Sequence, residues 1–173
     1  MKFPKVNYHI HTSFSDGKDD PLSYVKQAIK IKIDEIGFSD YLIILDNLKP
    51  SKNSINPQNL KFYIEEISRI KEEYKGKVKV KCRLEVDYIP SSFKYTWKLL
   101  NDYNFDFLIL SVHRLGNFHL DALSSRKIWE RLGQSEIRKV YFKYFETLQK
   151  GVKTGVFDII AHFDIVKKFR MTS

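Results

Sequence analysis

The chain alternates between strand-like and helix-like segments, and this alternation is the feature that most constrains its fold. Five short segments carry the apolar runs or two-residue alternation of β-strands, and segments with apolar residues at helical spacing lie between them. Such a series favours a parallel α/β fold, either a barrel or an open sheet. The expected strands are residues 6–12, 34–40, 77–89, 105–115 and 156–164, and the expected helices are residues 20–32, 56–76, 91–103 and 133–151.

Residue types at the helix ends support these boundaries. An Asp-Pro pair at residues 20–21 and an Asn-Pro pair at residues 56–57 are typical of the first turn of a helix, and Gly76 is suited to a helix C-terminus. The run FLIL at residues 107–110 is so continuously apolar that we expect its strand to be covered on both faces.

Composition predicts a single globular domain over residues 1–173. Of these residues 43% are hydrophobic, and no Pro/Gly/Ser-rich linker or fixed repeat divides them. We expect a cytoplasmic protein without a membrane partner, because the apolar runs are too short for a membrane span or a signal peptide. The single cysteine, Cys82, lies in an expected strand, which predicts a buried thiol and not a nucleophile.

The formal net charge of +9 could favour phosphate-bearing partners, including nucleic acid. The lysines, however, are scattered along the expected helices and mixed with glutamates. This pattern favours a solvated helix surface, so nucleic-acid binding is not expected.

Two histidines near the start of the chain could bind a metal ion. Side chains two residues apart on a strand share a face, so His9 and His11 can both reach one ion. The pair alone also fits an ordinary strand that carries two polar residues.

The other expected strands favour the metal site. Glu85, His113 and His162 each lie near the C-terminal end of a strand, where side chains converge in parallel barrels. Asp16, in the loop after His11, could add a carboxylate. A mixture of histidine and carboxylate ligands suits Zn, Mn or Fe, whereas oxygen ligands alone would suit Mg or Ca.

Strand alternation predicts which residues point inward with the two later histidines and which face the helices. The inward set is Ile109, Ser111 and His113 on the fourth strand with Asp158, Ile160 and His162 on the fifth, and the helix-facing set is Val112, Ala161 and Phe163.

Five motifs in order resemble those of the PHP-domain phosphoesterases, and most closely those of the histidinol-phosphatase branch. The likeness covers almost the whole chain. The motifs are YHIHTSFSDG at residues 8–17, GFSDY at 37–41, LEVDYIP at 84–90, LSVHRL at 110–115 and IAHFDIVKKF at 160–169.

The resemblance implies a distorted (β/α)7 TIM-like barrel of the PHP type, whose cleft holds up to three metal ions. It implies hydrolysis of L-histidinol phosphate, or another small phosphorylated substrate, by a metal-bound hydroxide with no protein nucleophile, as a step of histidine biosynthesis. Glu85 would bridge two metals. The implied ligands are His9, His11, Asp16, Glu85, His113 and His162.

Residues beside the fourth strand could contact the substrate. Arg114 and His119 are the candidates for substrate binding, and Arg126 and Asp121 are further possibilities. A role at the protein surface is the alternative for each of them.

The sequence departs from the family pattern in two respects. Tyr41 stands where the family normally has histidine, so the third metal site is in doubt unless Asp40 or a water replaces the missing ligand. We expect Tyr41 itself to pack over the cleft rim. The chain also provides only about five strand-helix units and lacks the C-terminal portion of a full PHP barrel. Open sheet edges would then favour self-association or pairing with a C-terminal fragment.

Two other functions compete with the phosphatase. A catalytically impaired fragment or paralogue could still bind metal or a partner chain, and Tyr41 favours this possibility. An amidohydrolase-like enzyme would also carry two such histidines on its first strand, but it usually relies on a bridging lysine where this chain has Glu85.

Overall fold

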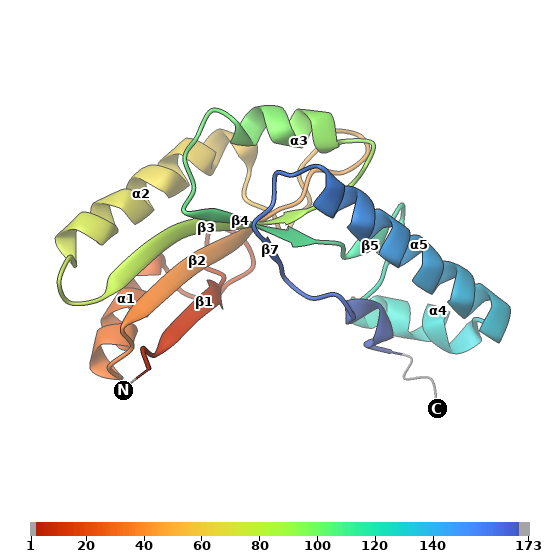
Figure 1. Cartoon of the computed structure of the whole chain (residues 1–173), viewed down its shortest axis with the longest axis horizontal. Helices are drawn as coiled ribbons and strands as arrows, with labels where there is room; N and C mark the ends of the chain where they lie inside the picture. The colour runs from red at the N-terminus through yellow and green to blue at the C-terminus, as the bar shows by residue number, and fades with distance from the viewer. Residues whose placement is uncertain (1–2, 170–173) are drawn as a thin grey trace.

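A computed structural model describes residues 3–169, which form a curved parallel sheet with helices along its outer side (Figure 1). The strand order is β1-β2-β3-β4-β7, and every neighbouring pair is parallel. The strands are β1 (Val6–Ile10), β2 (Glu35–Leu42), β3 (Lys79–Asp87), β4 (Phe107–Ser111) and β7 (Ile159–Ile160). The helices are α1 (Pro21–Lys30), α2 (Leu60–Glu73), α3 (Phe93–Leu100), α4 (Arg126–Arg131) and α5 (Gln134–Lys153).

The predicted parallel α/β fold is confirmed, and the four predicted helices lie within about four residues of their observed boundaries. Asp20 caps α1, where its carboxylate accepts a hydrogen bond of 2.9 Å from the amide of Ser23. Gly76 follows α2 with a φ of +83°, a conformation that glycine adopts without strain. A short hairpin of β5 (Arg114–Leu115) and β6 (Phe118–His119), together with α4, was not predicted, because such short elements carry no periodic signal.

Alternate residues of the strands pack beneath the helices and form the core. Under α1 and α2, the outward side chains of β2 and β3 join one apolar cluster that includes Phe38 and Leu84. Under α5, a second cluster contains Leu110 and Val112 of the β4 segment and Tyr144 of the helix. Val112 therefore faces the helices as predicted.

The predicted register of the fifth strand is wrong. Ile160 pairs with Leu110 and packs in the helix-side cluster, and Ile159 pairs with the inward Ile109. Phe163 does not face the helices either, since 64% of it is exposed. The reason is that β7 ends at Ile160, and the chain bends before it reaches His162.

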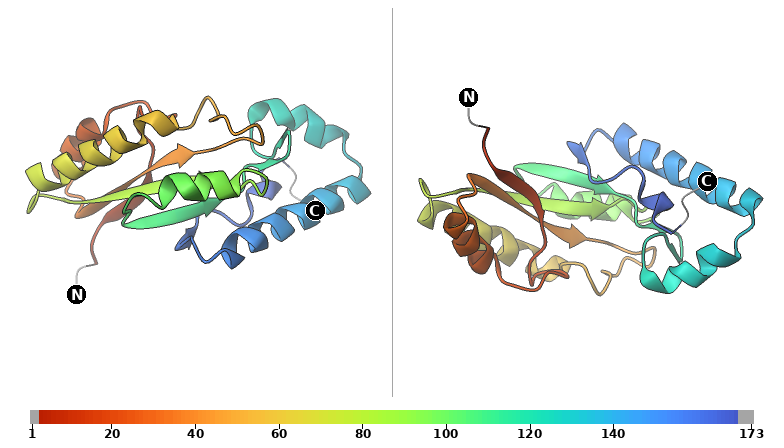
Figure 2. Two further views of the ribbon diagram at one scale, coloured as in Figure 1. Left: turned by 90° about the horizontal axis from the view of Figure 1, so that it is seen from above. Right: turned by 90° about the horizontal axis from the view of Figure 1, so that it is seen from below.

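The inner face of the sheet is polar, and its side chains are nevertheless buried. Ser39, Arg83, Glu85, Asp87 and Ser111 are each at most 2% exposed. Seen from below, the central strands have no helix of the described chain in front of them (Figure 2). The buried charges of this face therefore have to be satisfied by one another or by a ligand.

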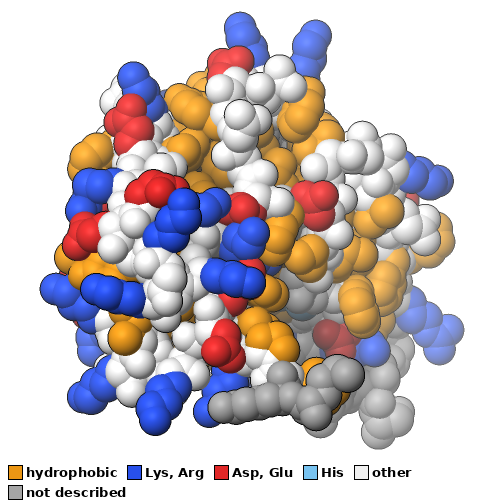
Figure 3. Space-filling model, turned by 60° about the vertical axis from the view of Figure 1, so that its left-hand side comes forward, with side chains coloured by type: hydrophobic (Ala, Val, Ile, Leu, Met, Phe, Trp, Pro, Cys, Tyr) orange, Lys and Arg blue, Asp and Glu red, His pale blue; other side chains and the backbone are white. Residues whose placement is uncertain are grey.

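Charged residues are interspersed on the surface. On the face shown in Figure 3, acidic side chains lie between the lysines and arginines. Ion pairs along α2, such as those of Arg69 with Glu66 and Glu73, follow the same pattern. Among residues 3–169, no helix has both the length and the apolar character needed to cross a membrane.

The environment of Cys82 predicts an unreactive thiol. Cys82 is buried beneath α2, and burial raises the pKa of its thiol to about 12. Because only the thiolate reacts, we expect a disulfide reagent to modify the native chain roughly 100-fold or more slowly than the denatured chain. The rate is measured from the absorbance of the thiol released by the reagent, and equal rates for the native and denatured chains would contradict the burial of Cys82.

Candidate metal centre

Four segments of the sheet deliver histidine or glutamate to one place on the inner face. His9 lies in β1 and His11 directly after it, and Glu85 lies in β3. His113 follows β4, and His162 follows β7. Parallel strands end at the same edge of a sheet, so residues far apart in sequence meet there.

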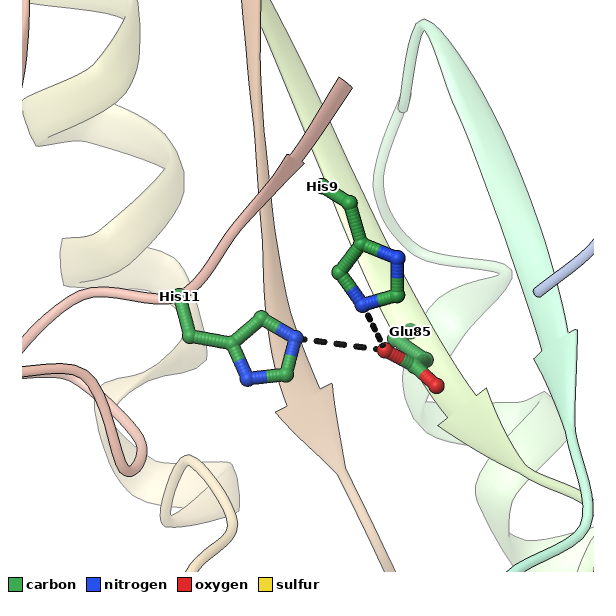
Figure 4. Close-up of side chains that lie close together, drawn as sticks. All are labelled: His9, His11 and Glu85. Atoms are coloured by element: carbon green, nitrogen blue, oxygen red, sulfur yellow. Dashed lines mark hydrogen bonds and ion pairs between the residues drawn. The ribbon is translucent and has the colours of Figure 1, made fainter. Parts of the chain in front are cut away.

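The first group consists of His9, His11 and Glu85, which Figure 4 shows converging from two strands. The Nε2 atom of His9 lies 2.7 Å from Oε2 of Glu85, and Nε2 of His11 lies 3.2 Å from the same oxygen. One carboxylate oxygen thus faces two imidazole nitrogens.

The second group consists of Glu85, His113 and His162. The Nε2 atoms of His113 and His162 lie 3.6 Å and 3.5 Å from the other oxygen of Glu85, Oε1, and 3.1 Å from each other. Within each group the potential ligand atoms lie within 4.8 Å of one another. Glu85 is therefore placed to bridge two ions, with one oxygen for each.

The contacts of these residues fit divalent metal ions. The side chain of Glu85 is fully buried, and among the described residues its Oε1 atom has no hydrogen-bond donor. A buried carboxylate oxygen without a donor is costly, and a cation would satisfy it. Imidazole and carboxylate are ligands that zinc and related transition metals prefer.

The histidines also determine the charge of the site. Burial would raise the pKa of Glu85, but hydrogen bonds and charges from the surrounding histidines outweigh this effect and lower its pKa well below the usual range. Burial likewise opposes protonation of His113, but contact with Asp87 raises the pKa of His113 to about 9. Metal binding would accordingly release a proton from His113.

Two carboxylates lie beside the Nδ1 atoms of His11 and His113. Asp16 lies 2.8 Å from Nδ1 of His11, and Asp87 lies 3.4 Å from Nδ1 of His113 while accepting a 2.7 Å hydrogen bond from the His113 amide. Such contacts fix the ring orientation of a metal ligand. Asp16 joins neither three-residue group, so its predicted role as a ligand stays a prediction. Sequence reasoning missed Asp87, although it lies two residues after Glu85 on the same face of β3.

Asp40 supports the loop that carries His11 and Asp16. Its carboxylate accepts hydrogen bonds from the amide of Thr12 at 2.7 Å, the hydroxyl of Thr12 at 3.1 Å and 3.0 Å, and the hydroxyl of Ser15 at 2.6 Å. Burial raises the pKa of Asp40, and these hydrogen bonds oppose that shift. Both oxygens are engaged in this way, so Asp40 does not replace a missing metal ligand here.

Tyr41 lies within the centre and not over its rim. Its ring centroid is 4.2 Å from that of His11 and 5.2 Å from that of His113, and its hydroxyl lies 3.5 Å from Nε2 of His113. Burial and nearby carboxylates raise the pKa of Tyr41 far above its ordinary value, so the phenol stays neutral. A neutral phenol is a weak metal ligand.

Helix α5 contributes to the position of His162. The hydroxyl of Tyr144 donates a 2.9 Å hydrogen bond to the backbone oxygen of His162. The helix lies so close to β4 that a Cβ atom at Gly151 would come within 2.7 Å of Leu110 and 3.2 Å of Tyr88. Gly151 thereby permits the close packing that places Tyr144 over the β7 segment.

The predicted substrate residues lie beside the two groups and not within them. Arg114 and His119 pair across the β5–β6 hairpin, and Arg114 lines small pockets together with Asp46 and Ile89. Arg126 lies on the exposed face of α4 and pairs with Glu130 at 3.1 Å. Asp121 lies 3.7 Å from Lys168. Substrate contact by these residues stays a prediction.

The fold and the site define a parallel α/β chain with two candidate metal-binding groups that share one carboxylate, and sequence comparison gives its family. The profile of the PHP domain matches residues 7–172, and the chain belongs to this family. The histidinol-phosphatase of Bacillus subtilis is 31% identical over 183 residues, which cover 95% of this chain and 68% of that protein. A protein named probable histidinol-phosphatase from Deinococcus radiodurans is 26% identical over 162 residues, 93% of this chain but only 61% of the relative.

Comparison of structures agrees about the fold. The crystal structure of histidinol phosphate phosphatase from Lactococcus lactis, complexed with zinc, L-histidinol and phosphate, superposes with a TM-score of 0.76 at 24% identity. The match covers 95% of this chain and 59% of that one. The described strands thus form part of a TIM-like barrel of the PHP type, as predicted.

The contacts of Asp40 predict that its removal destabilises the chain. Replacing Asp40 with alanine leaves buried donors of Thr12 and Ser15 unpaired, so we expect the free energy of unfolding in urea to fall by about 3 kcal/mol. The matched control is Asp102→Ala, at an exposed turn, which should change it by less than about 0.5 kcal/mol. Similar losses for the two variants would contradict the assigned role.

Proposed function

We propose that this chain belongs to a metal-dependent phosphomonoesterase that hydrolyses L-histidinol phosphate to L-histidinol and phosphate in histidine biosynthesis. The observation that carries the proposal is the meeting of two ligand groups on the two oxygens of Glu85. The histidinol-phosphatases among its relatives support the choice of substrate. The chain spans about three fifths of some of these relatives, so the activity is proposed for the protein to which this chain contributes.

The residues of the site have separate tasks in this reaction. His9 and His11 with one oxygen of Glu85 would hold one ion, and His113 and His162 with the other oxygen would hold a second. Divalent ions supply charge that attracts the phosphate and lowers the pKa of a coordinated water. Asp16 and the Asp87 carboxylate would keep the imidazoles oriented while the substrate binds and leaves.

The ligand types favour zinc, and manganese or iron are compatible with the same set. Zinc is also present in the Lactococcus lactis structure. We infer that the chain binds two ions and not three, because Tyr41 places a neutral phenol between the two groups.

A second candidate function is metal or partner binding without catalysis. It is favoured by Tyr41 inside the centre and by the two unpaired edges of the sheet, β1 and β7, among the described strands. Such edges can pair with another chain, either a second copy or a C-terminal fragment. A zinc-loaded chain that dimerises in light scattering but releases no phosphate would favour this function.

Replacing Glu85 tests the phosphatase directly. Glu85→Gln removes the charge that both ligand groups share, so we expect phosphate release from L-histidinol phosphate by the zinc-loaded chain to fall on the order of 10³-fold. Glu65→Gln, on the exposed face of α2, is the matched control and should keep its activity. Phosphate release that Glu85→Gln leaves unchanged would refute the proposed role of this centre in the reaction.

Replacing Tyr41 tests the number of metal ions. Tyr41→His places an imidazole beside His11 and His113, so we expect metal analysis after dialysis to find about one more zinc per chain than in the wild type. Tyr41→Phe, which adds no ligand, should leave the zinc content unchanged. An unchanged zinc content in Tyr41→His would show that Tyr41 does not limit the number of ions.

A further inference from the structure

The first strand contains a β-bulge immediately before the metal centre. Asn7 pairs with Ile36 and Ile10 pairs with Phe38, so two residues of β1, Tyr8 and His9, face the single residue between Ile36 and Phe38 in β2. The amide of His9 donates a 3.1 Å hydrogen bond to the side chain of Asn7, which satisfies a backbone group that the bulge removes from the ladder.

The bulge determines the face on which His9 and His11 lie. Asn7 pairs with Ile36, whose side chain points to the helices, so regular alternation from Asn7 would turn His9 and His11 to that outer face as well. The extra residue reverses the alternation, because a shift by one residue moves every following side chain to the opposite face. As a result Tyr8 and His9 both lie on the inner side, and His9 reaches Glu85.

Arg83 occupies the space beneath this bulge. It lies two residues before Glu85 on the inner face of β3 and is 1% exposed. Its Nη1 atom donates a 2.6 Å hydrogen bond to the backbone oxygen of Tyr8. Its guanidinium packs against two aromatic rings, 4.8 Å from the centroid of Tyr8 and 3.9 Å from that of Phe107.

Gly37 provides the room for Arg83. It is the residue of β2 that faces the bulge, and a Cβ atom there would lie 2.7 Å from both Cδ and Nη1 of Arg83. These atoms belong to the Arg83 side chain and not to the backbone, so an alanine at this position would displace the guanidinium. Gly37→Ala therefore disturbs Arg83 without altering any proposed metal ligand.

We propose that Arg83 is a positioning residue for the metal centre, which holds the β1 bulge and thereby turns His9 and His11 toward Glu85. The proposal rests on the metal site proposed above. It explains why the guanidinium of Arg83 is buried although, among residues 3–169, it forms no ion pair with a carboxylate. Arg83 acts through the backbone oxygen of Tyr8 and contacts neither the metal nor the substrate.

The test compares Gly37→Ala and Arg83→Lys with the control Gly133→Ala, where a new Cβ would meet only Glu136 at an ordinary 3.5 Å. In the metal-free chain, NMR signals of the five histidine rings are assigned by single substitution. We expect the signals of His9 and His11 to shift in Gly37→Ala, and those of His113, His119 and His162 to stay. Arg83→Lys keeps the charge but loses the planar fork, and a smaller shift of the same two signals is expected.

Zinc titration of the same variants gives the second measurement. We expect the affinity for zinc at His9 and His11 to fall about 10- to 100-fold in Gly37→Ala, as for other groups that support metal ligands, while His113 and His162 still respond to zinc. The control should match the wild type in both measurements.

The outcomes separate this proposal from the proposed function. A wild-type chain that binds no zinc refutes the metal site, and the ring signals of the metal-free chain still decide whether Arg83 positions His9. Unchanged His9 and His11 signals in folded Gly37→Ala and Arg83→Lys would overturn the proposal. Equal shifts of all five histidines would also overturn it, because they would indicate general loosening of the fold.

Discussion

The buried carboxylate of Glu85 is the constraint on which the inner face of this sheet depends. An ionised group that is 0% exposed is costly unless opposite charge surrounds it, and the chain meets this need with imidazoles from three other segments. Each oxygen faces its own pair of histidines. The histidines that offset this one charge form the two candidate ligand groups, and the polar inner face is the consequence.

Parallel topology explains how so few residues build the centre. Each residue of the candidate site lies in a strand or in the segment that follows one, and the helices return the chain to the opposite edge of the sheet. Loops then refine what the strands deliver. Asp40 secures the segment that begins at Thr12, and Asp87 secures His113 through both its amide and its ring.

Much of the fold and most residues of the candidate site could be predicted, because both depend on periodicity. Strand alternation placed His113 correctly, and repeated strand-helix units predicted the parallel sheet. The position of His162 could not be derived in this way, since β7 has only two residues and the chain bends after it. The bulge in β1 left no sequence signal beyond Gly37, whose meaning depends on Arg83 in another strand. Features that depend on contacts between distant segments could not be predicted from local sequence patterns.

The close packing of α5 against β4 has a consequence for how the protein can change during evolution. Gly151 has no room for a side chain, and Tyr144 of the same helix holds the backbone at His162. Any residue that pushes the helix outward would also withdraw one imidazole from Glu85. Selection for the activity of the site will therefore restrict variation along the buried side of α5, although this helix contributes no residue to the candidate ligand groups. The substitutions tolerated there will be as few as those tolerated in an active-site segment.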